Sequence, residues 1–317
     1  TQLLTIDAQI ETQLGDAIAA LAQSPLRNQI GPLADWQYSG EADAKLHLEI
    51  PLKQIPGKAI TGDYLVNAKL RGGSVDIPNT PISISQLKGG LNFSVADGLY
   101  SEDITGEFWQ QPLSAKLFRT SKQQKVAIST AVEPESLSKL VKFPWTKVLT
   151  GTIPIEGLLS INGADAPGSG VTLQLVSQME ASEIMLPAPL TKVAGESRAL
   201  DVTLHFDPDF QRLEGRIGDQ LVTDLRFNQS QMTHGLVSFD RSVSVPEVGE
   251  LLVAGYLPTT DLDLWNPVVA LFSGSSESKA TVWQPVFDLE FDYLNLATFK
   301  LENIAAQIRF DEQATNI

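Results

Sequence analysis

The sequence has 317 residues, of which 43% are hydrophobic and 19% are charged. Its formal net charge of −15 repels phosphate backbones, which argues against nucleic acid as a partner and against docking on an anionic membrane surface. The absence of cysteine excludes disulfides, thiolate metal sites and cysteine nucleophiles.

The N-terminal residues carry no targeting signal. The opening TQLLTIDAQIETQLG lacks the basic region and the continuous apolar region of a signal peptide, and no apolar run in the chain is long enough to span a membrane. The chain also starts without Met. We therefore expect an excised segment of a larger protein, with any membrane anchor outside it.

Helical spacing occurs in only a few short stretches. An amphipathic helix is predicted over residues 10–22, a second over 24–34 and a third over 134–142. The apolar stripe of the first is Ile10, Leu14, Ala17, Ile18 and Leu21. Such short helices cannot form a layer of their own, so we expect them to cap or plug the ends of a sheet.

Alternation of apolar and polar residues dominates the rest of the chain. In residues 44–52, Leu46, Leu48 and Ile50 fall on one face of a predicted half-buried strand, and polar residues fall on the other. Further predicted strands have the apolar members Leu91, Phe93 and Val95; Ile153 and Ile155; Val171, Leu173 and Leu175; Val202, Leu204 and Phe206; Phe287, Leu289, Phe291 and Tyr293; and Ile304, Ala306, Ile308 and Phe310.

Turn signals separate these segments at short spacing. Gly72–Gly73, Gly89–Gly90 and Asp97–Gly98 each predict a hairpin turn. Short connections favour antiparallel pairing, because parallel strands need long crossovers. We therefore predict a mainly β fold with a mostly antiparallel sheet.

Three similar passages indicate an internal repeat. Each leads through a helix-like or polar stretch to a glycine that opens an alternating segment, at Gly40, Gly151 and Gly255. These spacings correspond to a period of about 105 residues, which predicts approximate modules 1–133, 134–240 and 241–317. Stacked modules that complete one another's apolar faces would give an elongated body.

No motif for catalysis or metal binding is present. The three histidines, His47, His205 and His234, lie far apart and are interpreted as solvent-facing polar positions. The sequence has no nucleophile elbow, no P-loop and no dinucleotide fingerprint. We therefore expect neither an enzyme nor a cofactor.

Paired carboxylates offer the main chemical alternative. The pairs are Glu102–Asp103, Asp207 with Asp209, and Asp261 with Asp263. No calcium-loop pattern surrounds them, and Asp261 and Asp263 are predicted to share one face of a strand. We interpret all three pairs as solvated positions.

The apolar strand faces exceed what the predicted helices can cover. Such a face must pack against a second sheet, close on itself, or curl into a groove that accepts an apolar ligand. The third arrangement would turn a requirement of folding into a binding function.

Three passages carry a resemblance to a known family. Residues 84–119, ISQLKGGLNFSVADGLYSEDITGEFWQQPLSAKLFR, combine a Gly-Gly step, an L-x-F alternation, a DGL tripeptide and a Q-P-L-x-A-x-L ending. The other two are SPLRNQIGPLADWQYSGEADAKLHLEIPL, and VAGYLPTTDLDLW with the later DLEFDYLNLATFKLENI. This pattern resembles the repeats of the AsmA-like proteins of Gram-negative envelopes, and most closely their YhdP branch.

The resemblance implies a taco-like, curled β-sheet with a hydrophobic groove. It also implies a periplasmic location, a tether to the inner membrane through a transmembrane helix outside this segment, and a role in moving phospholipids toward the outer membrane. Other envelope proteins would be possible partners.

The leading hypothesis is a lipid-conducting groove along which acyl chains slide passively. Each buried methylene would gain about 0.8 kcal/mol, and its surroundings would change little from strand to strand. The predicted lining residues are Leu46, Leu48, Ile50, Leu91, Phe93, Val95, Ile153, Ile155, Leu204, Phe206, Phe287, Leu289 and Phe291.

Two alternatives remain open. The first is a structural or assembly protein of the cell envelope with a closed β-core and no lipid, which would bind partners through its sheet edges. The second is a carbohydrate-binding or carbohydrate-cleaving β-solenoid, which would use the scattered tryptophans and the paired carboxylates.

Overall fold

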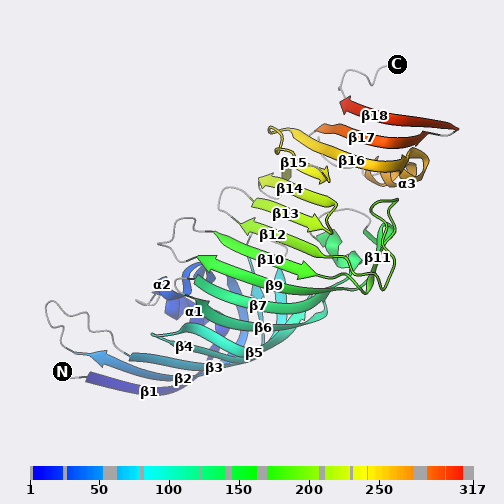
Figure 1. Ribbon diagram of the computed structural model, residues 1–317. Coiled ribbons are helices and arrows are strands. Elements are labelled where there is room, and N and C mark those ends of the chain that lie inside the picture. Colours follow the sequence, from blue (N-terminus) through cyan, green and yellow to red (C-terminus); the bar gives the residue numbers. More distant parts are fainter. Residues whose placement is uncertain are drawn as a thin grey trace. The chain divides into compact units, whose positions relative to one another are not determined.

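The computed structural model is built mainly of β-strands, with a few short helices (Figure 1). It describes residues 3–23, 27–52, 63–78, 82–120, 123–139, 145–162, 170–206, 211–228, 231–240, 242–273, 284–296 and 298–309. No helix within these ranges reaches the length and apolarity that a bilayer crossing requires.

The structure contains many more strands than helices. The helices are α1 (Leu14–Gln23), α2 (Arg27–Ile30) and α3 (Leu262–Ser273), with 3-10 helices η1 (Gly31–Asp35), η2 (Pro134–Lys139) and η3 (Trp145–Lys147). The strands are β1 (Leu3–Gln13), β2 (Gln37–Pro51), β3 (Asp63–Asp76), β4 (Ser83–Ser94), β5 (Gly98–Phe108), β6 (Gln111–Thr120), β7 (Gln123–Val132), β8 (Leu149–Gly151), β9 (Ile153–Asn162), β10 (Val171–Ser177), β11 (Ser182–Ile184), β12 (Leu200–Phe206), β13 (Gln211–Ile217), β14 (Leu221–Asn228), β15 (Gln231–Phe239), β16 (Glu250–Asp261), β17 (Gln284–Leu296) and β18 (Phe299–Arg309).

Within the described residues, 16 strands form one hydrogen-bonded sheet, and β8 pairs with β11 separately. The order of the large sheet is β1-β2-β3-β4-β5-β6-β7-β9-β10-β12-β13-β14-β15-β16-β17-β18. The sheet is mixed, mostly antiparallel and not closed. This confirms the predicted mainly β, mostly antiparallel fold with few short helices.

Two strand pairs depart from the antiparallel rule. β16 pairs in parallel with both β15 and β17. Helix α3 provides the long crossover that a parallel pair requires, because it lies in the chain between β16 and β17. The short connections in the sequence predicted antiparallel pairs, so these two parallel pairs are a departure from that prediction.

The chain divides into two compact units. Unit 1 comprises Thr1–Ala131 and Glu156–Leu173, and unit 2 comprises Val132–Ile155 and Gln174–Ile317. The modules 1–133, 134–240 and 241–317 remain a prediction from the repeat.

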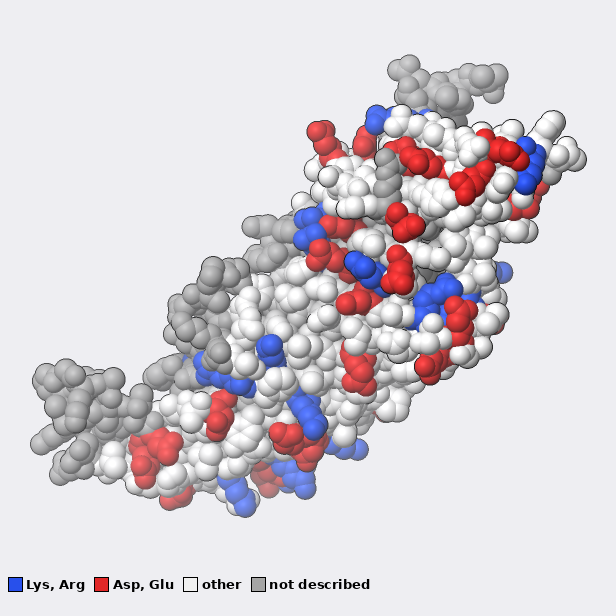
Figure 2. Space-filling view, in the orientation of Figure 1, with Lys and Arg blue, Asp and Glu red and all other residues white. Residues whose placement is uncertain are grey.

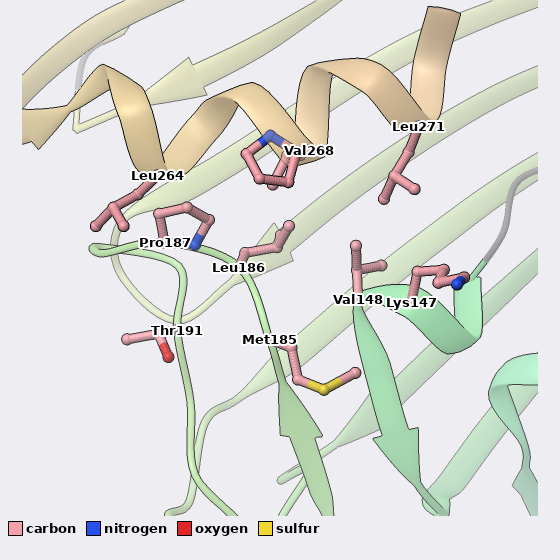
Figure 3. A pocket seen from close by; sticks show the side chains of 10 residues that line it. Lys147, Val148, Met185, Leu186, Pro187, Thr191, Leu264, Val268 and Leu271 are labelled. Carbon is pink, nitrogen blue, oxygen red and sulfur yellow. The ribbon is translucent and has the colours of Figure 1, made fainter. Parts of the chain in front are cut away.

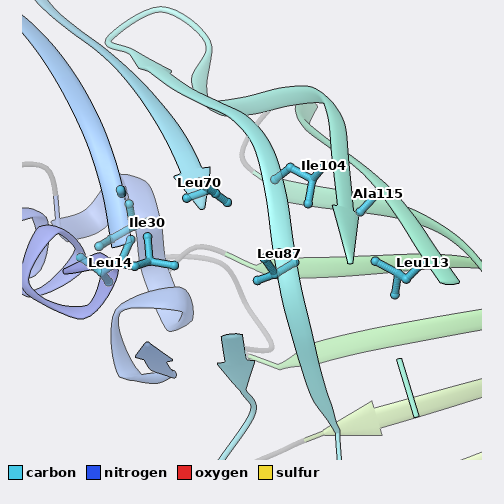
Figure 4. Close-up of a cluster of buried hydrophobic side chains, with 9 residues drawn as sticks. Leu14, Ile30, Leu70, Leu87, Ile104, Leu113 and Ala115 are labelled. Carbon is cyan, nitrogen blue, oxygen red and sulfur yellow. The ribbon is translucent and has the colours of Figure 1, made fainter. Parts of the chain in front are cut away.

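The core of unit 1 lies where α1 and α2 pack on the sheet (Figure 4). Leu14 and Ile18, one helical turn apart on α1, are both buried. The sheet side of the cluster consists of Ala42, Leu70, Leu87, Ile104, Leu113 and Ala115. One end of the apolar sheet face is thereby covered by helix.

The predicted helix over 10–22 begins later than the apolar stripe indicated. Residues Ile10 to Gln13 belong to β1, where they pair with Ala44 to Glu41 of β2. The strand ladder satisfies their backbone groups, so the helix starts at Leu14. The second predicted helix splits into α2 and η1, and the third is the 3-10 helix η2 over its described residues.

Two predicted turns are wrong. Gly72–Gly73 lies inside β3 and Gly89–Gly90 lies inside β4. The register shifts near both pairs, and a Cβ on Gly89 would collide with the backbone carbonyl of Asp103. These glycines permit irregular strand pairing, not chain reversal. Residues 95–97 do form the predicted turn before Gly98.

The three repeat glycines share a backbone requirement. Gly40, Gly151 and Gly255 all have positive φ, at 92°, 79° and 133°. At each, an added Cβ would collide with backbone atoms of a neighbouring segment. Glycine is required there because only it accepts both the conformation and the close approach.

Candidate functional site

Unit 1 carries a face of apolar side chains across β1 to β4. Directly paired residues on neighbouring strands point to the same side of a sheet, so the register defines rows. One row joins Ala8, Leu46, Val66 and Phe93. Neighbouring rows on this face are Leu4–Ile50, Ile6–Leu48–Tyr64 and Ile10–Ala44–Ala68–Leu91.

Exposure of this face falls from the edge strand inward. On β1, Leu4 is 43% exposed and Ile6 is 37% exposed, whereas Phe93 on β4 is 1% exposed. Leu46 and Leu48 on β2 are half-buried. Large apolar side chains at the β1 side therefore lack full cover by protein within the described residues.

The opposite face of the same strands is mainly polar, although Leu3 and Leu65 also lie on it, at 50% and 38% exposure. His47 lies between Leu46 and Leu48 in sequence, and its Nδ1 is 2.7 Å from Oδ1 of Asp7. This hydrogen bond raises the pKa of His47 above its ordinary value of 6.5. On the same side, Arg71 forms an ion pair with Asp43. The sheet of unit 1 thus separates an apolar from a charged surface.

Unit 2 has a similar apolar face across β12 to β18. One row joins Leu204, Leu213 and Leu225. Neighbouring rows are Leu200–Ile217–Leu221–Phe239 and Val202–Gly215–Thr223–Val237–Val253–Phe287–Ile308. The core cluster around Leu221, Phe239 and Phe291 covers one end of this face, where Leu190 and Leu262 pack against it.

The opposite face of unit 2 carries a charged network centred on Asp224. Arg212 donates to both carboxylate oxygens of Asp224 at 3.1 and 2.6 Å, and Arg226 donates at 2.9 and 3.3 Å. Burial alone would raise the pKa of Asp224, but the two guanidinium groups outweigh it and hold this pKa below its ordinary value. Figure 2 shows acidic and basic side chains interspersed on the visible surface.

Most of the predicted lining residues lie on the apolar face of unit 1 or on that of unit 2. Five lie on the unit 1 face, namely Leu46, Leu48, Ile50, Leu91 and Phe93. Five lie on the unit 2 face, namely Leu204, Phe206, Phe287, Leu289 and Phe291. Phe93 and Phe291 are buried, and the other eight are half-buried.

The remaining three predicted residues differ from these. Val95 lies in the turn between β4 and β5, outside the regular alternation. Ile153 and Ile155 lie at the start of β9 and are buried, at 4% and 6% exposure. Their assignment to a lining surface remains a prediction.

The paired carboxylates have local partners. Glu102 forms an ion pair with Lys116, and Asp103 accepts a hydrogen bond from the backbone of Gly90. Asp261 and Asp263 do not share a strand face: Asp261 ends β16, and its Oδ1 accepts from the backbone N–H of Asp263 at the start of α3. Asp207 and Asp209 lie outside the described residues. Among the described residues, no group of three or more potential ligands could hold a metal ion.

Sequence reasoning missed a pocket in unit 2 (Figure 3). It lies between α3, residues 185–191, and the segment Lys147–Val148, and has a volume of about 490 Å³. Leu264, Pro267, Val268 and Leu271 contribute from α3 at the spacing i, i+3, i+4, i+7. This helical spacing is visible in the sequence, but the alternation of residues 261–265 at its start predicted a strand.

The geometry defines a class of protein: an open, mostly antiparallel β-sheet with extended apolar rows on one face of each unit and charged clusters on the opposite face. The chain belongs to the YhdP protein family, whose model matches residues 1–317. This confirms the resemblance to AsmA-like proteins of the YhdP branch.

One characterised relative comes from Escherichia coli (strain K12). The chain is 28% identical over 254 residues to the intermembrane phospholipid transporter YhdP of that organism. The match covers 76% of this chain but only 18% of the relative, so the chain spans less than a fifth of that protein. No solved structure matches the chain.

Proposed function

We propose that the apolar faces of the two units support the acyl chains of phospholipids during transport between the inner and outer membranes. The observation that carries the proposal is the row of half-buried and exposed apolar side chains on one side of an open sheet. The similarity to an intermembrane phospholipid transporter supports the same function. The periplasm is the compartment that fits it.

The apolar face of each unit suits the acyl chains of an amphiphile. An acyl chain could lie on the row of unit 1 that contains Leu46 or on the row of unit 2 that contains Leu204. In either place it gains about 0.8 kcal/mol per buried methylene, while the head group stays in water. Successive rows present similar aliphatic side chains, so displacement from one strand to the next changes the binding energy little. We propose that acyl chains slide passively along the sheet, and that this segment itself performs no chemical step.

Site-specific photo-crosslinking tests the proposal. A photoreactive residue replaces Leu48, whose side chain lies on the apolar face between Ile6 and Tyr64. The full-length protein is irradiated in the cell envelope and examined by mass spectrometry. We expect a phospholipid adduct at this position.

The matched control replaces Glu49, the next residue on β2, which points to the opposite face. We expect no adduct at Glu49 above background. Equal adducts at both positions would indicate non-specific contact, and absence of an adduct at Leu48 with normal expression would contradict the proposal.

A scaffold with a dry core is the second candidate, and the burial of Phe93 at 1% exposure favours it locally. The two candidate functions differ in whether the protein keeps bound phospholipid. A lipid-conducting segment carries phospholipid in native mass spectrometry, whereas a scaffold carries none.

A further inference from the structure

The pocket of unit 2 is lined almost entirely by apolar side chains. Met185 and Leu264, on opposite sides of it, are 43% and 60% exposed, which is high for large apolar residues. In Figure 3, Leu264 projects from α3 beside Pro187, and Leu271 projects from the same helix toward Val148. Its volume of about 490 Å³ falls within the usual range of small-ligand sites.

The loop that forms one wall is held firmly in place. Arg198 donates hydrogen bonds to the carbonyl oxygens of Leu190 and Thr191 at 2.9 and 2.8 Å. Lys192 is 1% exposed, and its ammonium group donates to the carbonyl of Ser182 at 2.6 Å. A wall anchored in this way keeps the pocket open without a ligand, so binding requires little reorganisation.

The pocket has one charged group. Lys147 is exposed at its rim and forms no ion pair among the described residues, in a chain of net charge −15. A lone cation beside an apolar cavity complements an amphiphile with an anionic head group. Leu190 and Leu262, next to the pocket in sequence, also pack on the apolar face of unit 2.

We infer that this pocket binds one acyl chain of a phospholipid, with the phosphate of the head group at the ammonium group of Lys147. The inference rests on the proposed function and adds a defined binding site beside the apolar face of unit 2. The lipid would occupy this site where its acyl chains enter or leave that face.

The three methionines provide a direct test. Met185 lines the pocket, Met232 pairs with Phe227 on the apolar face, and Met179 is 3% exposed. Methyl NMR spectra of the 13C-methionine-labelled chain are recorded during titration with dihexanoyl phosphatidylglycerol below its micelle concentration. We expect saturable shifts of Met185, with Met179 unchanged as a reporter of the fold.

Variants of the pocket sharpen the test. Lys147→Gln should raise the dissociation constant at Met185 about threefold, as expected for one exposed ion pair, and Lys147→Arg should restore it. Val268→Glu should abolish the Met185 response and leave that of Met232. The outer position Asn266→Glu on α3 serves as the matched control and should leave both responses intact.

The outcomes separate the two proposals. A shift of Met232 without Met185 would overturn the pocket and leave the apolar face supported, and a shift of neither would contradict both. An equal Met185 response to octyl glucoside, unaffected by Lys147→Gln, would overturn the role of the phosphate. A Met185 shift that depends on protein concentration without lipid would assign the pocket to a second copy of the chain.

Discussion

At the scale of single residues, the charged faces contain groups whose titration depends on one or two neighbours. The side chain of Asp224 is only 11% exposed and lies between Arg212 and Arg226, so its removal takes away the carboxylate that two partly buried guanidinium groups share. The side chain of His47 is 42% exposed, and Asp7 is its main partner. We expect pH to have opposite effects on the stability that these two sites contribute.

Replacing Asp224 by Asn should lower the free energy of unfolding by about 2–3 kcal/mol, because an ion pair with little solvent is broken from one side. The folded-state pKa of Asp224 lies below its ordinary value of 3.8, so its contribution is complete above pH 3.8 and is lost as pH falls through the depressed value. Urea unfolding at pH 7 and at lower pH measures both effects. The exposed control Asp219→Asn should change the midpoint little, and an equal loss in both variants would refute the role of the network.

The pKa of His47 should fall toward 6.5 when Asp7 is replaced by Asn, because the hydrogen bond that favours the imidazolium is lost. In the wild type the raised pKa means that the pair stabilises the fold below pH 6.5, and that this contribution disappears as pH rises through the folded value. Titration of the imidazole signals by NMR measures the shift. Glu11→Gln on the same strand should leave the pKa unchanged, and a wild-type value at 6.5 would contradict the prediction.

At the scale of elements, glycine positions and crossovers determine how the strands pair. Gly255 lies in β16 beside Phe239 of β15, in the parallel part of the sheet. Its positive φ and its contact with the carbonyl of Phe239 leave no space for a side chain. A side chain at this position would therefore disturb the end of the parallel pairing between β15 and β16.

Gly255→Ala should destabilise unit 2 by about 3 kcal/mol or more, since strain at a positive φ adds to a collision with backbone. Gly195→Ala is the control, because Gly195 also has positive φ but no atom within 4 Å of an added Cβ. We expect the control to cost only about 1 kcal/mol. Thermal unfolding followed by circular dichroism measures both, and equal losses would show that the close approach is unimportant.

At the scale of the whole molecule, each unit has an apolar face of its own. Leu46→Glu in unit 1 and Leu204→Glu in unit 2 should each reduce the phospholipid bound per chain, and the double variant should abolish binding. A carboxylate beside an acyl chain either loses its hydration or holds water on the face, at a cost of several kcal/mol. Native mass spectrometry counts the bound lipid.

The neighbouring substitution Lys45→Glu changes the opposite face of β2 and serves as the control. It should leave the bound lipid unchanged. Undiminished binding in the double variant, with native circular dichroism, would show that these faces do not hold the lipid.

Much of this architecture could be predicted from local patterns. The alternation at Leu46, Leu48 and Ile50 correctly predicted β2 and its apolar side, because side-chain direction in a strand reverses at each residue. The pattern failed at Asp261–Asp263, where a side-chain cap starts α3, and at Ile10, which β2 draws into a strand. At Asp261 a local side-chain cap decided the structure, and at Ile10 a strand partner far away in the chain did so.

The sequence by itself determined most element types, the two-sided character of the strands and the family, because these depend on residue order over short distances. Only the tertiary structure decided that β16 has two parallel neighbours, that Leu190 and Leu262 cover one end of an apolar face, and that Lys147 and α3 border a pocket. These features join residues far apart in the chain. Strand partners and packed contacts depend on the free energy of the whole fold, which a local pattern does not contain.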